Sequence, residues 1–360
     1  MKNKVFIIAE AGVNHNGSVK RACDLVDAAA GANADAVKFQ TFKADKVVVK
    51  DTPKANYQKQ TTGMADDQLE MIRGLELSED DFQIIADYSR EKGIEFMSTP
   101  FDLDSALFLR DKLGIKRIKI PSGEVTNGPY LLDLARLGLP MILSTGMSNL
   151  EEVRVALNVL AFGLQDSTAG YPSQYDLENH IHNDNIFKKL EERVTVLHCT
   201  TEYPAPIEDI NLLAMTVMRD IFQLPIGYSD HTLGTTISVA AVGMGARVIE
   251  KHLTLDKQLS GPDHRASLEP QEFVNLVSQI RSLETGLGEP EKKCSSSEEI
   301  NIPVARRSIV AAKDIKKGDI LTHNCLTTKR PGNGLSPMKY WDLIGTAANK
   351  SYKTDELIKL

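Results

Sequence analysis

The chain has 360 residues, of which 42% are hydrophobic and 25% charged, and its formal net charge is −7 at pH 7. An acidic chain lacks the clustered Lys and Arg side chains that phosphate contacts require, so the composition excludes a general nucleic-acid-binding protein. No run of 18 apolar residues occurs, so no membrane span is expected.

Eight short apolar runs recur along the chain, rich in Val, Ile and Phe, and they begin near residues 5, 36, 94, 117, 140, 194, 224 and 247. Such short, continuous hydrophobicity is typical of parallel strands that are covered on both faces. Helix-like spacing of apolar residues occupies most of the segments between them, namely 19–30, 79–92, 104–113, 131–137, 150–160, 212–222, 235–245 and 270–287. This alternation predicts an α/β fold, a (β/α)8 TIM barrel, which needs about 250 residues.

Cysteine usage and the N-terminal residues indicate a cytoplasmic protein. The four cysteines have no C-x-x-C spacing, which favours free thiols in a reducing compartment. The first apolar run is interrupted at Glu10, too early for a signal peptide, so we interpret it as the first strand.

Two connections between the predicted strands are longer than ordinary links. Long connections in compact domains are usually functional or disordered. Residues 43–78 follow a strand, and we expect them to fold over the pocket as a lid. Residues 163–192, which include His180 and His182, precede the sixth strand, and we expect them to be surface decoration.

The composition changes near residue 287. Residues 288–300 are rich in Gly, Pro, Ser, Lys and Glu, which indicates a linker. Residues 301–360 form a patterned unit with Gly and Pro turns, too small to be a second enzyme. We therefore expect a catalytic barrel over residues 1–287, a linker over 288–300 and a small C-terminal domain over 301–360.

Most of the apolar runs end in polar residues that can carry chemistry. The strands of a TIM barrel bring their carboxyl ends to one face, where the active site lies. The residues that we expect around one pocket are Glu10, Asn14, Lys38, Gln40, Thr99, Lys119, Ser122, Ser144, His198, Thr200, Ser229, Asp230, His231, Glu250 and His252.

Two histidines end neighbouring strands, His231 on the seventh and His252 on the eighth. Two imidazoles that project into one pocket suit a divalent transition metal with open positions for water and substrate. Asp230 and Glu250 are candidates to orient these rings. The alternative is that each histidine only forms hydrogen bonds in the barrel mouth.

Lys38 and Lys119 lie inside apolar strands, where an unpaired lysine is costly. With the nearby hydroxyl residues they suggest a cradle for phosphate and carboxylate. Two alternatives remain: a Schiff-base lysine of an aldolase, and structural ion pairs to Glu10, Glu124 or Glu250.

Glu10 ends the first strand and could act as a general base or bind substrate hydroxyls. The Asn14-His15-Asn16-Gly17 segment that follows could instead only begin a helix, and for His15 a structural role is as well supported as a functional one. Asp263, in the segment SGPDH, could bind sugar hydroxyls or be an ordinary turn residue.

Taken together and in this order, the motifs resemble the sialic acid synthase family, the phosphoenolpyruvate-dependent synthases of nine-carbon sugar acids. The resemblance runs from residue 5 to about 357, and its motifs are IIAEAGVNHNGS, VKFQTF, FMSTPFD, KIPSGE, LSTGM, HCTTEYPAP, GYSDHT, EKHLTLD, SGPDH, RRSIVAAKDIKKG and KRPGNG. The C-terminal unit resembles the antifreeze-like domain of that family, a SAF domain of the β-clip type.

The resemblance implies an activity and a set of roles. The family condenses phosphoenolpyruvate with an N-acylated mannose-type sugar and water and releases phosphate by C–O cleavage. A divalent metal ion, Mn2+ with Mg2+ or Co2+ as alternatives, would bind His231 and His252 and polarise the sugar aldehyde. The other implied roles are a reaction-centre carboxylate for Glu10, phosphate and carboxylate binding for Lys38, Thr99, Lys119, Ser122, Ser144 and Ser229, and sugar contacts for Gln40, Tyr203 and Asp263.

The resemblance also implies a domain-swapped homodimer, in which the C-terminal domain of one subunit covers the barrel of the other. Arg330, in the KRPGNG motif, would then reach the N-acyl group of the sugar. Without the resemblance, Arg330 would be interpreted as a surface residue, and the C-terminal unit could be an ice- or carbohydrate-binding module.

The sequence leaves the sugar open. Some sialic acid synthases carry Asn after the His-Cys pair, whereas this chain has Thr200-Thr201-Glu202-Tyr203, as in synthases that make legionaminic acid. The candidates are N-acetylmannosamine, which gives N-acetylneuraminate, and 2,4-diacetamido-2,4,6-trideoxymannose, which gives N,N'-diacetyllegionaminate.

Overall fold

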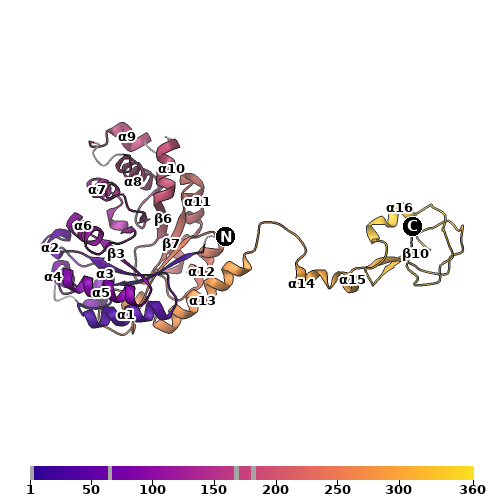
Figure 1. The fold of residues 1–360 in the computed structure, drawn as a ribbon, viewed down its shortest axis with the longest axis horizontal. Coiled ribbons are helices and arrows are strands. Elements are labelled where there is room, and N and C mark those ends of the chain that lie inside the picture. The colour runs from indigo at the N-terminus through magenta and orange to yellow at the C-terminus, as the bar shows by residue number, and fades with distance from the viewer. Residues whose placement is uncertain (1–3, 64–66, 166–169, 180–183) are drawn as a thin grey trace. The chain divides into compact units, whose positions relative to one another are not determined.

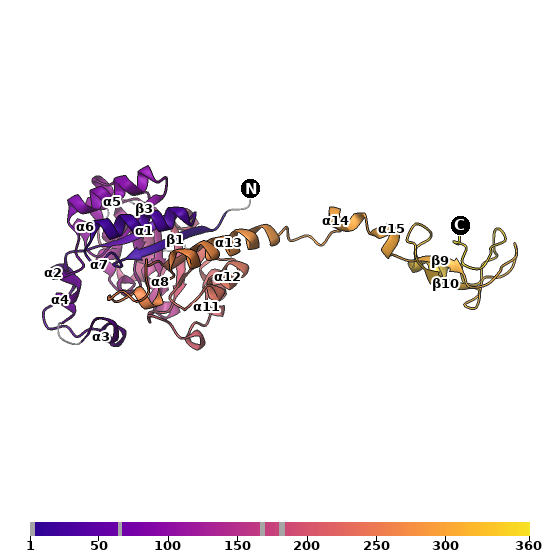
Figure 2. The same cartoon turned by 90° about the horizontal axis from the view of Figure 1, so that it is seen from below.

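The computed structural model describes residues 4–63, 67–165, 170–179 and 184–360, so His180 and His182 lie outside the described residues. The chain divides into two compact units, Met1–Gly288 and Glu289–Leu360 (Figures 1 and 2). No helix among the described residues is both long and apolar enough to cross a membrane.

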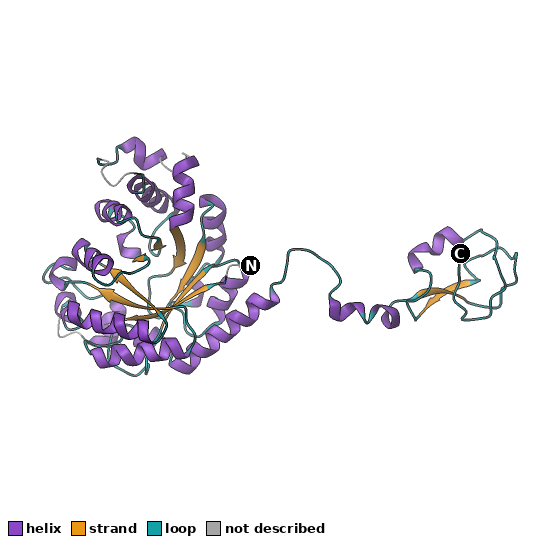
Figure 3. Ribbon diagram, viewed as in Figure 1, coloured by secondary structure: helices purple, strands orange, loops and turns teal. Residues whose placement is uncertain are grey.

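The first unit is a barrel of eight parallel strands, and every predicted strand is present (Figure 3). The strands are β1 Phe6–Gly12, β2 Ala36–Thr41, β3 Glu95–Pro100, β4 Ile118–Ile120, β5 Met141–Ser144, β6 Val194–Cys199, β7 Ile226–Asp230 and β8 Val248–His252. Their hydrogen-bonded order is β3-β2-β1-β8-β7-β6-β5-β4, and β3 packs beside β4 to close the ring. The predicted TIM-barrel class is confirmed.

An outer ring of helices covers the barrel (Figure 1). They are α1 Val19–Gly31, α5 Glu79–Glu91, α6 Leu103–Asp111, α7 Gly128–Arg136, α8 Leu150–Gly163, α11 Leu213–Phe222, α12 Thr236–Gly243 and α13 Pro270–Gly286. Helix α1 illustrates why: Ser18 caps its first turn by accepting from the Arg21 amide, and Leu25 and Val26 are fully buried. Helix α1 thus begins at a polar cap and buries one apolar stripe against the barrel.

The floor of the barrel is a small apolar cluster. Ile8, Ala36, Met97, Ile142, Leu197 and Val248 supply its buried members, one from each of six strands. Gly227 on β7 faces the same floor, and a Cβ there would lie 2.5 Å from both Leu197 Cδ2 and the Val248 carbonyl oxygen. Because strand side chains alternate, residues two positions further along each strand point into the space above this floor.

The two long connections contain short helices. Residues 43–78 hold α2 Ala44–Val47, α3 Asn56–Thr62 and α4 Gln68–Arg73, which lie at the carboxyl ends of the strands. The described part of residues 163–192 holds α9 Gln174–Asn179 and α10 Asp184–Arg193, which pack against α8 on the outside of the barrel.

The second unit has its own core, made of Ile309, Ala311, Ile315, Leu321, Cys325, Leu326, Leu343, Ala348, Tyr352 and Ile358. Its elements are α14 Ser296–Glu299, α15 Ile302–Ala305, α16 Tyr340–Leu343 and an antiparallel pair, β9 Ser308–Ala311 with β10 Leu326–Lys329. Residues 288–300, expected to be only a linker, therefore include one short helix. Isolated bridges such as Val310 with Leu357 tie the remaining loops together.

Candidate active site

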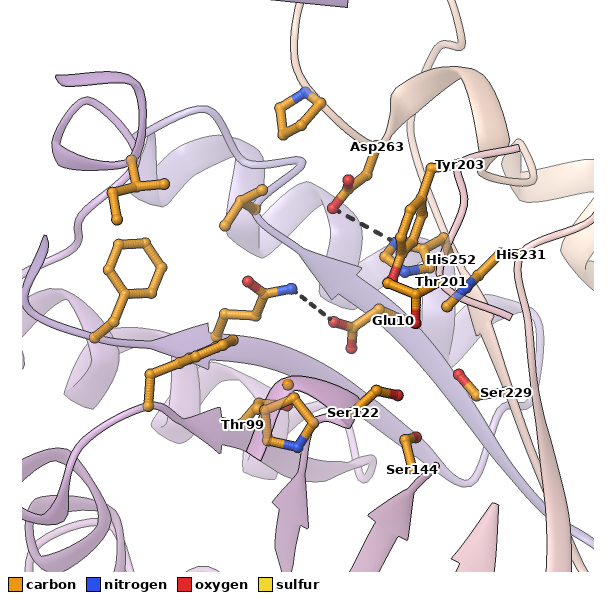
Figure 4. Close-up of a pocket in the computed structure, with 18 of the residues that line it drawn as sticks. Glu10, Thr99, Ser122, Ser144, Thr201, Tyr203, Ser229, His231, His252 and Asp263 are labelled. Carbon is orange, nitrogen blue, oxygen red and sulfur yellow. Dashed lines mark hydrogen bonds and ion pairs between the residues drawn. The ribbon is translucent and has the colours of Figure 1, made fainter. Parts of the chain in front are cut away.

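A cavity of about 390 Å3 opens at the carboxyl ends of the strands, and all eight strands contribute to its lining (Figure 4). Of the residues that the sequence assigns to substrate or metal, the lining includes Glu10, Lys38, Gln40, Thr99, Lys119, Ser122, Ser144, Tyr203, Ser229, His231, His252 and Asp263. Arg330 belongs to the second unit, directly after β10, where its side chain is exposed.

The inner layer of the cavity, next to the floor, consists of buried charges. The Lys38 ammonium lies 2.5 Å from Glu10 Oε2 and 3.7 Å from Glu250 Oε2 and donates to Thr99 Oγ1 at 2.9 Å. Lys119 lies 3.2 Å from Glu250 Oε1. Strand register produces this layer, since Glu10 pairs with Lys38 across β1 and β2. The ion pairs to Glu10 and Glu250 that the sequence left as an alternative are therefore present.

The two carboxyls of this layer differ in their pKa values. Burial raises the pKa of Glu10 to about 7, because it outweighs the attraction of Lys38. Burial also opposes ionisation of Glu250, but Lys119 and Lys38 together lower its pKa to about 2. Near neutral pH, Glu250 is thus a fixed anion, whereas Glu10 can take up or release a proton.

The environment of Lys38 opposes Schiff-base chemistry. Burial favours its neutral amine, but Glu10 and Glu250 outweigh that effect and raise its pKa above the ordinary value. A lysine nucleophile requires the opposite shift, since only the free amine attacks a carbonyl group. The aldolase alternative is therefore disfavoured for Lys38.

His231 and His252 face each other in the outer layer, with ring centroids 5.4 Å apart. Tyr203 stacks on His231 at a centroid distance of 4.1 Å, and His231 Nδ1 lies 2.6 Å from the Thr200 carbonyl oxygen. Burial lowers the pKa of His231 to about 4 and that of His252 well below its ordinary value, so both rings are neutral at pH 7.

This pair fits a divalent cation, because neutral imidazoles are its preferred nitrogen ligands. His252 Nδ1 is buried, has no hydrogen-bond partner in the described part of the chain, and lies 3.9 Å from Asp263 Oδ2 (Figure 4). Among the described residues, however, no three His, Cys, Asp or Glu side chains are arranged as a complete metal cage. An ion held by His231 and His252 would thus keep positions open for water and substrate.

Two residues that we expected in the pocket point away from it. Asp230 forms a fully buried ion pair with Lys251, at 3.0 Å, on the helix side of the sheet, and accepts from Ser238 of α12. His198 Nε2 bonds to the Ile210 carbonyl oxygen instead of facing the cavity. Alternation explains both, because each directly precedes or follows an inward-facing residue. Asp230 therefore does not orient the histidine rings.

The expected loop residues Asn14 and Thr200 also take other positions. Asn14 bonds to the loop that follows β8, and Thr200 meets the site through its backbone carbonyl group. His15 is buried, and its Nδ1 accepts from the Gly17 amide, as in a helix start.

Unpartnered hydroxyls mark the substrate space. Ser144 Oγ and Thr201 Oγ1 are buried and lack hydrogen-bond partners among the described residues. Ser122 Oγ accepts from the Gly146 amide at 3.0 Å. Gly146 itself is required by space, since a Cβ there would lie 2.3 Å from Thr201 Oγ1. Thr201 was not among the expected site residues, although its place directly after the strand-six motif signals it.

The outer wall of the cavity comes from the long connection that contains the segment from Tyr57 to Thr62. The connection over residues 43–78 lines the cavity, as its expected lid role requires, through Val47, Val48, Tyr57, Gln58, Gln68, Met71, Ile72 and Leu75. Tyr57 continues the aromatic stack, with its ring centroid 5.0 Å from that of Tyr203. This wall is mainly apolar, in contrast to the charged layer at the floor.

Comparisons with known proteins identify the family of both units. Residues 25–292 match the model of the NeuB family, and residues 306–360 match the SAF domain. The chain is 49% identical to the N,N'-diacetyllegionaminic acid synthase of Campylobacter jejuni, over 99% of each chain. It is 48% identical to the enzyme of the same name from Legionella pneumophila, over 95% of this chain and 89% of that one.

A solved structure shows the same architecture. The N-acetylneuraminic acid synthetase of Leptospira borgpetersenii superposes with a TM-score of 0.68 at 32% identity, over 83% of this chain and 90% of the other. The resemblance that the motifs indicated is thereby confirmed, and the chain belongs to the NeuB family of sialic acid synthases.

Proposed function

We propose that this protein is an N,N'-diacetyllegionaminic acid synthase. It condenses phosphoenolpyruvate with 2,4-diacetamido-2,4,6-trideoxymannose and water, and it releases phosphate. The observation that carries this choice is the full-length similarity to two legionaminic acid synthases, each at nearly half of all positions identical. It favours one of the two sugars that the motifs alone left balanced.

The apolar outer wall supports the same choice. A 6-deoxy sugar with two acetamido groups presents three methyl groups, whereas N-acetylmannosamine presents one methyl group and more hydroxyls. Val47, Met71, Ile72 and Leu75 can cover methyl groups but offer no hydrogen bonds to hydroxyls. We therefore assign the wall to the substituents of the diacetamido sugar.

Phosphoenolpyruvate fits the inner layer. When Glu10 is protonated, Lys38 and Lys119 face only one ionised carboxylate, Glu250, so the layer carries a net positive charge. Ser144, Ser122, Thr99 and Ser229 add hydroxyl groups around it. An anion bound there is held by charge-assisted hydrogen bonds away from water.

The metal ion is part of this proposal. We assign a divalent ion, Mn2+ in preference to Mg2+ or Co2+, to His231 and His252. When bound, it supplies a Lewis acid for the aldehyde oxygen of the open-chain sugar. The Thr200 carbonyl oxygen orients His231, and Tyr203 shields one face of that ring from water.

Glu10 serves the proton transfers at the reaction centre. Carbon 3 of phosphoenolpyruvate attacks the sugar aldehyde, water then adds to carbon 2, and the tetrahedral centre expels phosphate by C–O cleavage. The protonated Glu10 carboxyl, with a pKa of about 7, can give its proton to the sugar alkoxide that this attack forms, and the carboxylate that results can then accept the proton that the attacking water must lose. Gln40 donates to Glu10 Oε1 at 3.3 Å and fixes its orientation.

The barrel over residues 1–287 would carry the chemistry, and the domain over 301–360, joined by the linker 288–300, would complete the sugar site. In a domain-swapped homodimer, Arg330 of one subunit would bind the N-acyl group held in the other. We place the reaction in the cytoplasm, where phosphoenolpyruvate is formed.

One assay tests the proposal. The protein is incubated with phosphoenolpyruvate and either the diacetamido sugar or N-acetylmannosamine, and the acid formed is identified by mass while phosphate is measured. We expect the diacetamido sugar to give the higher kcat/KM. A preference for N-acetylmannosamine would contradict the sugar assignment but leave the synthase class intact. Full activity of His231→Ala with His252→Ala in chelator-treated buffer would refute the metal assignment.

A further inference from the structure

The segment Asn14-His15-Asn16-Gly17 lies beside the pocket, yet none of its four residues lines the cavity. It connects β1 to α1, and Asn14 is only 1% exposed. The proposed reaction therefore gives this segment no task, although Asn14 and His15 are buried. Its contacts show what it holds.

Asn14 bonds to the loop between β8 and α13. Its Nδ2 donates to the Leu253 carbonyl oxygen and to Ser267 Oγ, both at 2.9 Å. Ser267 Oγ in turn donates to the Asp263 carbonyl oxygen at 2.7 Å, and Ser267 is 1% exposed. A continuous buried chain of hydrogen bonds thus runs from Asn14 through Ser267 to the backbone of Asp263.

Asn16 makes a second connection to the same loop. Its Nδ2 donates to the Ser260 carbonyl oxygen at 2.8 Å, and its Oδ1 lies 3.2 Å from His264 Nε2. The other ring nitrogen of His264 lies 2.7 Å from Thr254 Oγ1. His264 directly follows Asp263, so Asp263 is held through its own carbonyl group and through its neighbour.

A glycine lets the two loops approach this closely. A Cβ at Gly261 would lie 2.7 Å from His264 Cδ2, closer than real Cβ atoms come, and 3.0 Å from Asn16 Oδ1, which is a tight contact. The SGPDH segment can therefore lie against the Asn14–Gly17 segment only because this position has no side chain.

The group held in place is the Asp263 carboxylate. Its Oδ2 lies 3.9 Å from His252 Nδ1 and borders the space above Gly12, where a Cβ would be 3.7 Å from it and 3.2 Å from Glu10 Oε1. The described residues give this carboxylate no hydrogen-bond partner, so its position depends strongly on the backbone that carries it. Asp263 thus faces His252 and the sugar end of the cavity (Figure 4).

We propose that Asn14 and Ser267, with Asn16 and His264, are positioning residues that hold Asp263 in its productive place over the sugar. This rests on the proposed function, because Asp263 contacts the sugar only if the pocket binds one. Misplacement of a substrate-contacting group by about 1 Å can reduce the rate strongly, so loss of one bond in the chain is expected to be measurable.

A double-mutant cycle tests the coupling. Ser267→Ala, Asp263→Asn and the double variant are assayed with phosphoenolpyruvate and the sugar that the product assay selects. We expect Ser267→Ala to lower kcat/KM for the sugar about tenfold while the KM for phosphoenolpyruvate changes less than about twofold. In the Asp263→Asn background, Ser267→Ala should lower kcat/KM for the sugar by less than about a further twofold.

Ser89→Ala is the matched control, since Ser89 is also a fully buried serine, but it donates to the Ile85 carbonyl oxygen within α5. If Ser267→Ala fails to fold, Asn14→Ala repeats the test, because Asn14 is the other end of the hydrogen-bond chain that reaches Asp263 through Ser267. Equal losses from Ser267→Ala in both backgrounds, or wild-type kinetics for Asp263→Asn, would overturn the positioning role. If the variants still form the nine-carbon acid, the proposed function stands even when the positioning role is overturned.

Discussion

Burial of single ionisable side chains links the stability of this protein to pH. His15 is 1% exposed, and its pKa is lowered to about 4 by burial and, secondarily, by Arg21. The native state therefore keeps this ring neutral at a pH where the unfolded chain protonates it. The stability that His15 contributes is present above pH 6.5 and is lost as the pH falls towards 4.

We expect His15→Gln to flatten this dependence. The free energy of unfolding of the wild type should fall by about 1–3 kcal/mol more than that of the variant between pH 7 and pH 4.5. Urea denaturation followed by circular dichroism at several pH values measures both. Parallel curves for the two proteins would show that His15 is protonated in the native state as well.

The residue scale also shows the limit of a motif. The motif around His231 was recognised in the sequence, and alternation was sufficient to place Ser229 and His231 on one face. Asp230 was nevertheless expected in the pocket, because a polar residue at a strand end resembles a ligand. The structure turns it outward, where Lys251 neutralises it and Ser238 donates to it. Which charges pair with one another depends on the register between strands, and register cannot be determined from a single sequence.

At the scale of elements, the barrel depends on one missing side chain. Gly227 lies on β7 between Leu197 and Val248, and a methyl group there would meet a backbone oxygen that cannot rotate away. We expect Gly227→Ala to destabilise the first unit by about 1–3 kcal/mol, as overpacking does.

Thermal unfolding measures this loss. Gly286→Ala is the control, because Gly286 ends α13 and the described structure has no atom within 4 Å of a Cβ there. That control should be neutral or slightly stabilising. An unchanged melting temperature for Gly227→Ala would mean that β7 and β8 can move apart to admit the methyl group without a loss of stability.

Elements were predictable to different degrees. Strands such as β1 and β5 could be predicted because they begin with continuous apolar runs, as expected of strands covered on both faces. The short helices α2, α3 and α4 were not expected, since four to seven residues contain too few turns for a periodic signal. Only their packing over the pocket defines them, and packing is a tertiary property.

For the whole molecule, the two units have separate cores, so we expect two unfolding transitions. Ile85→Ala removes a fully buried side chain from the first unit, and Ile309→Ala removes one from the second. Each change should cost about 2–5 kcal/mol in its own unit only. Calorimetry of the full chain checks this, and a shift of both transitions by either variant would show that the cores unfold as one.

The fold and the family could be predicted from the sequence at this scale, since eleven motifs in order constrain a chain strongly. The relation of Arg330 to the sugar could not be derived from the residues themselves. Under the proposal, Arg330 acts from a partner subunit, and the local pattern around Arg330 is that of an ordinary exposed turn.

The apolar floor formed by Ile8, Met97, Leu197 and their neighbours closes the bottom of the pocket. Along β2, Lys38 lies two residues nearer that floor than Gln40, and along β8, Glu250 lies two residues nearer than His252. The proposed binding site for phosphoenolpyruvate is therefore deeper in the pocket than the proposed binding site for the sugar. A molecule bound at the mouth therefore blocks the route to the bottom. In the proposed reaction, this depth predicts an order of binding and release: phosphoenolpyruvate enters before the sugar, and inorganic phosphate leaves after the nine-carbon acid.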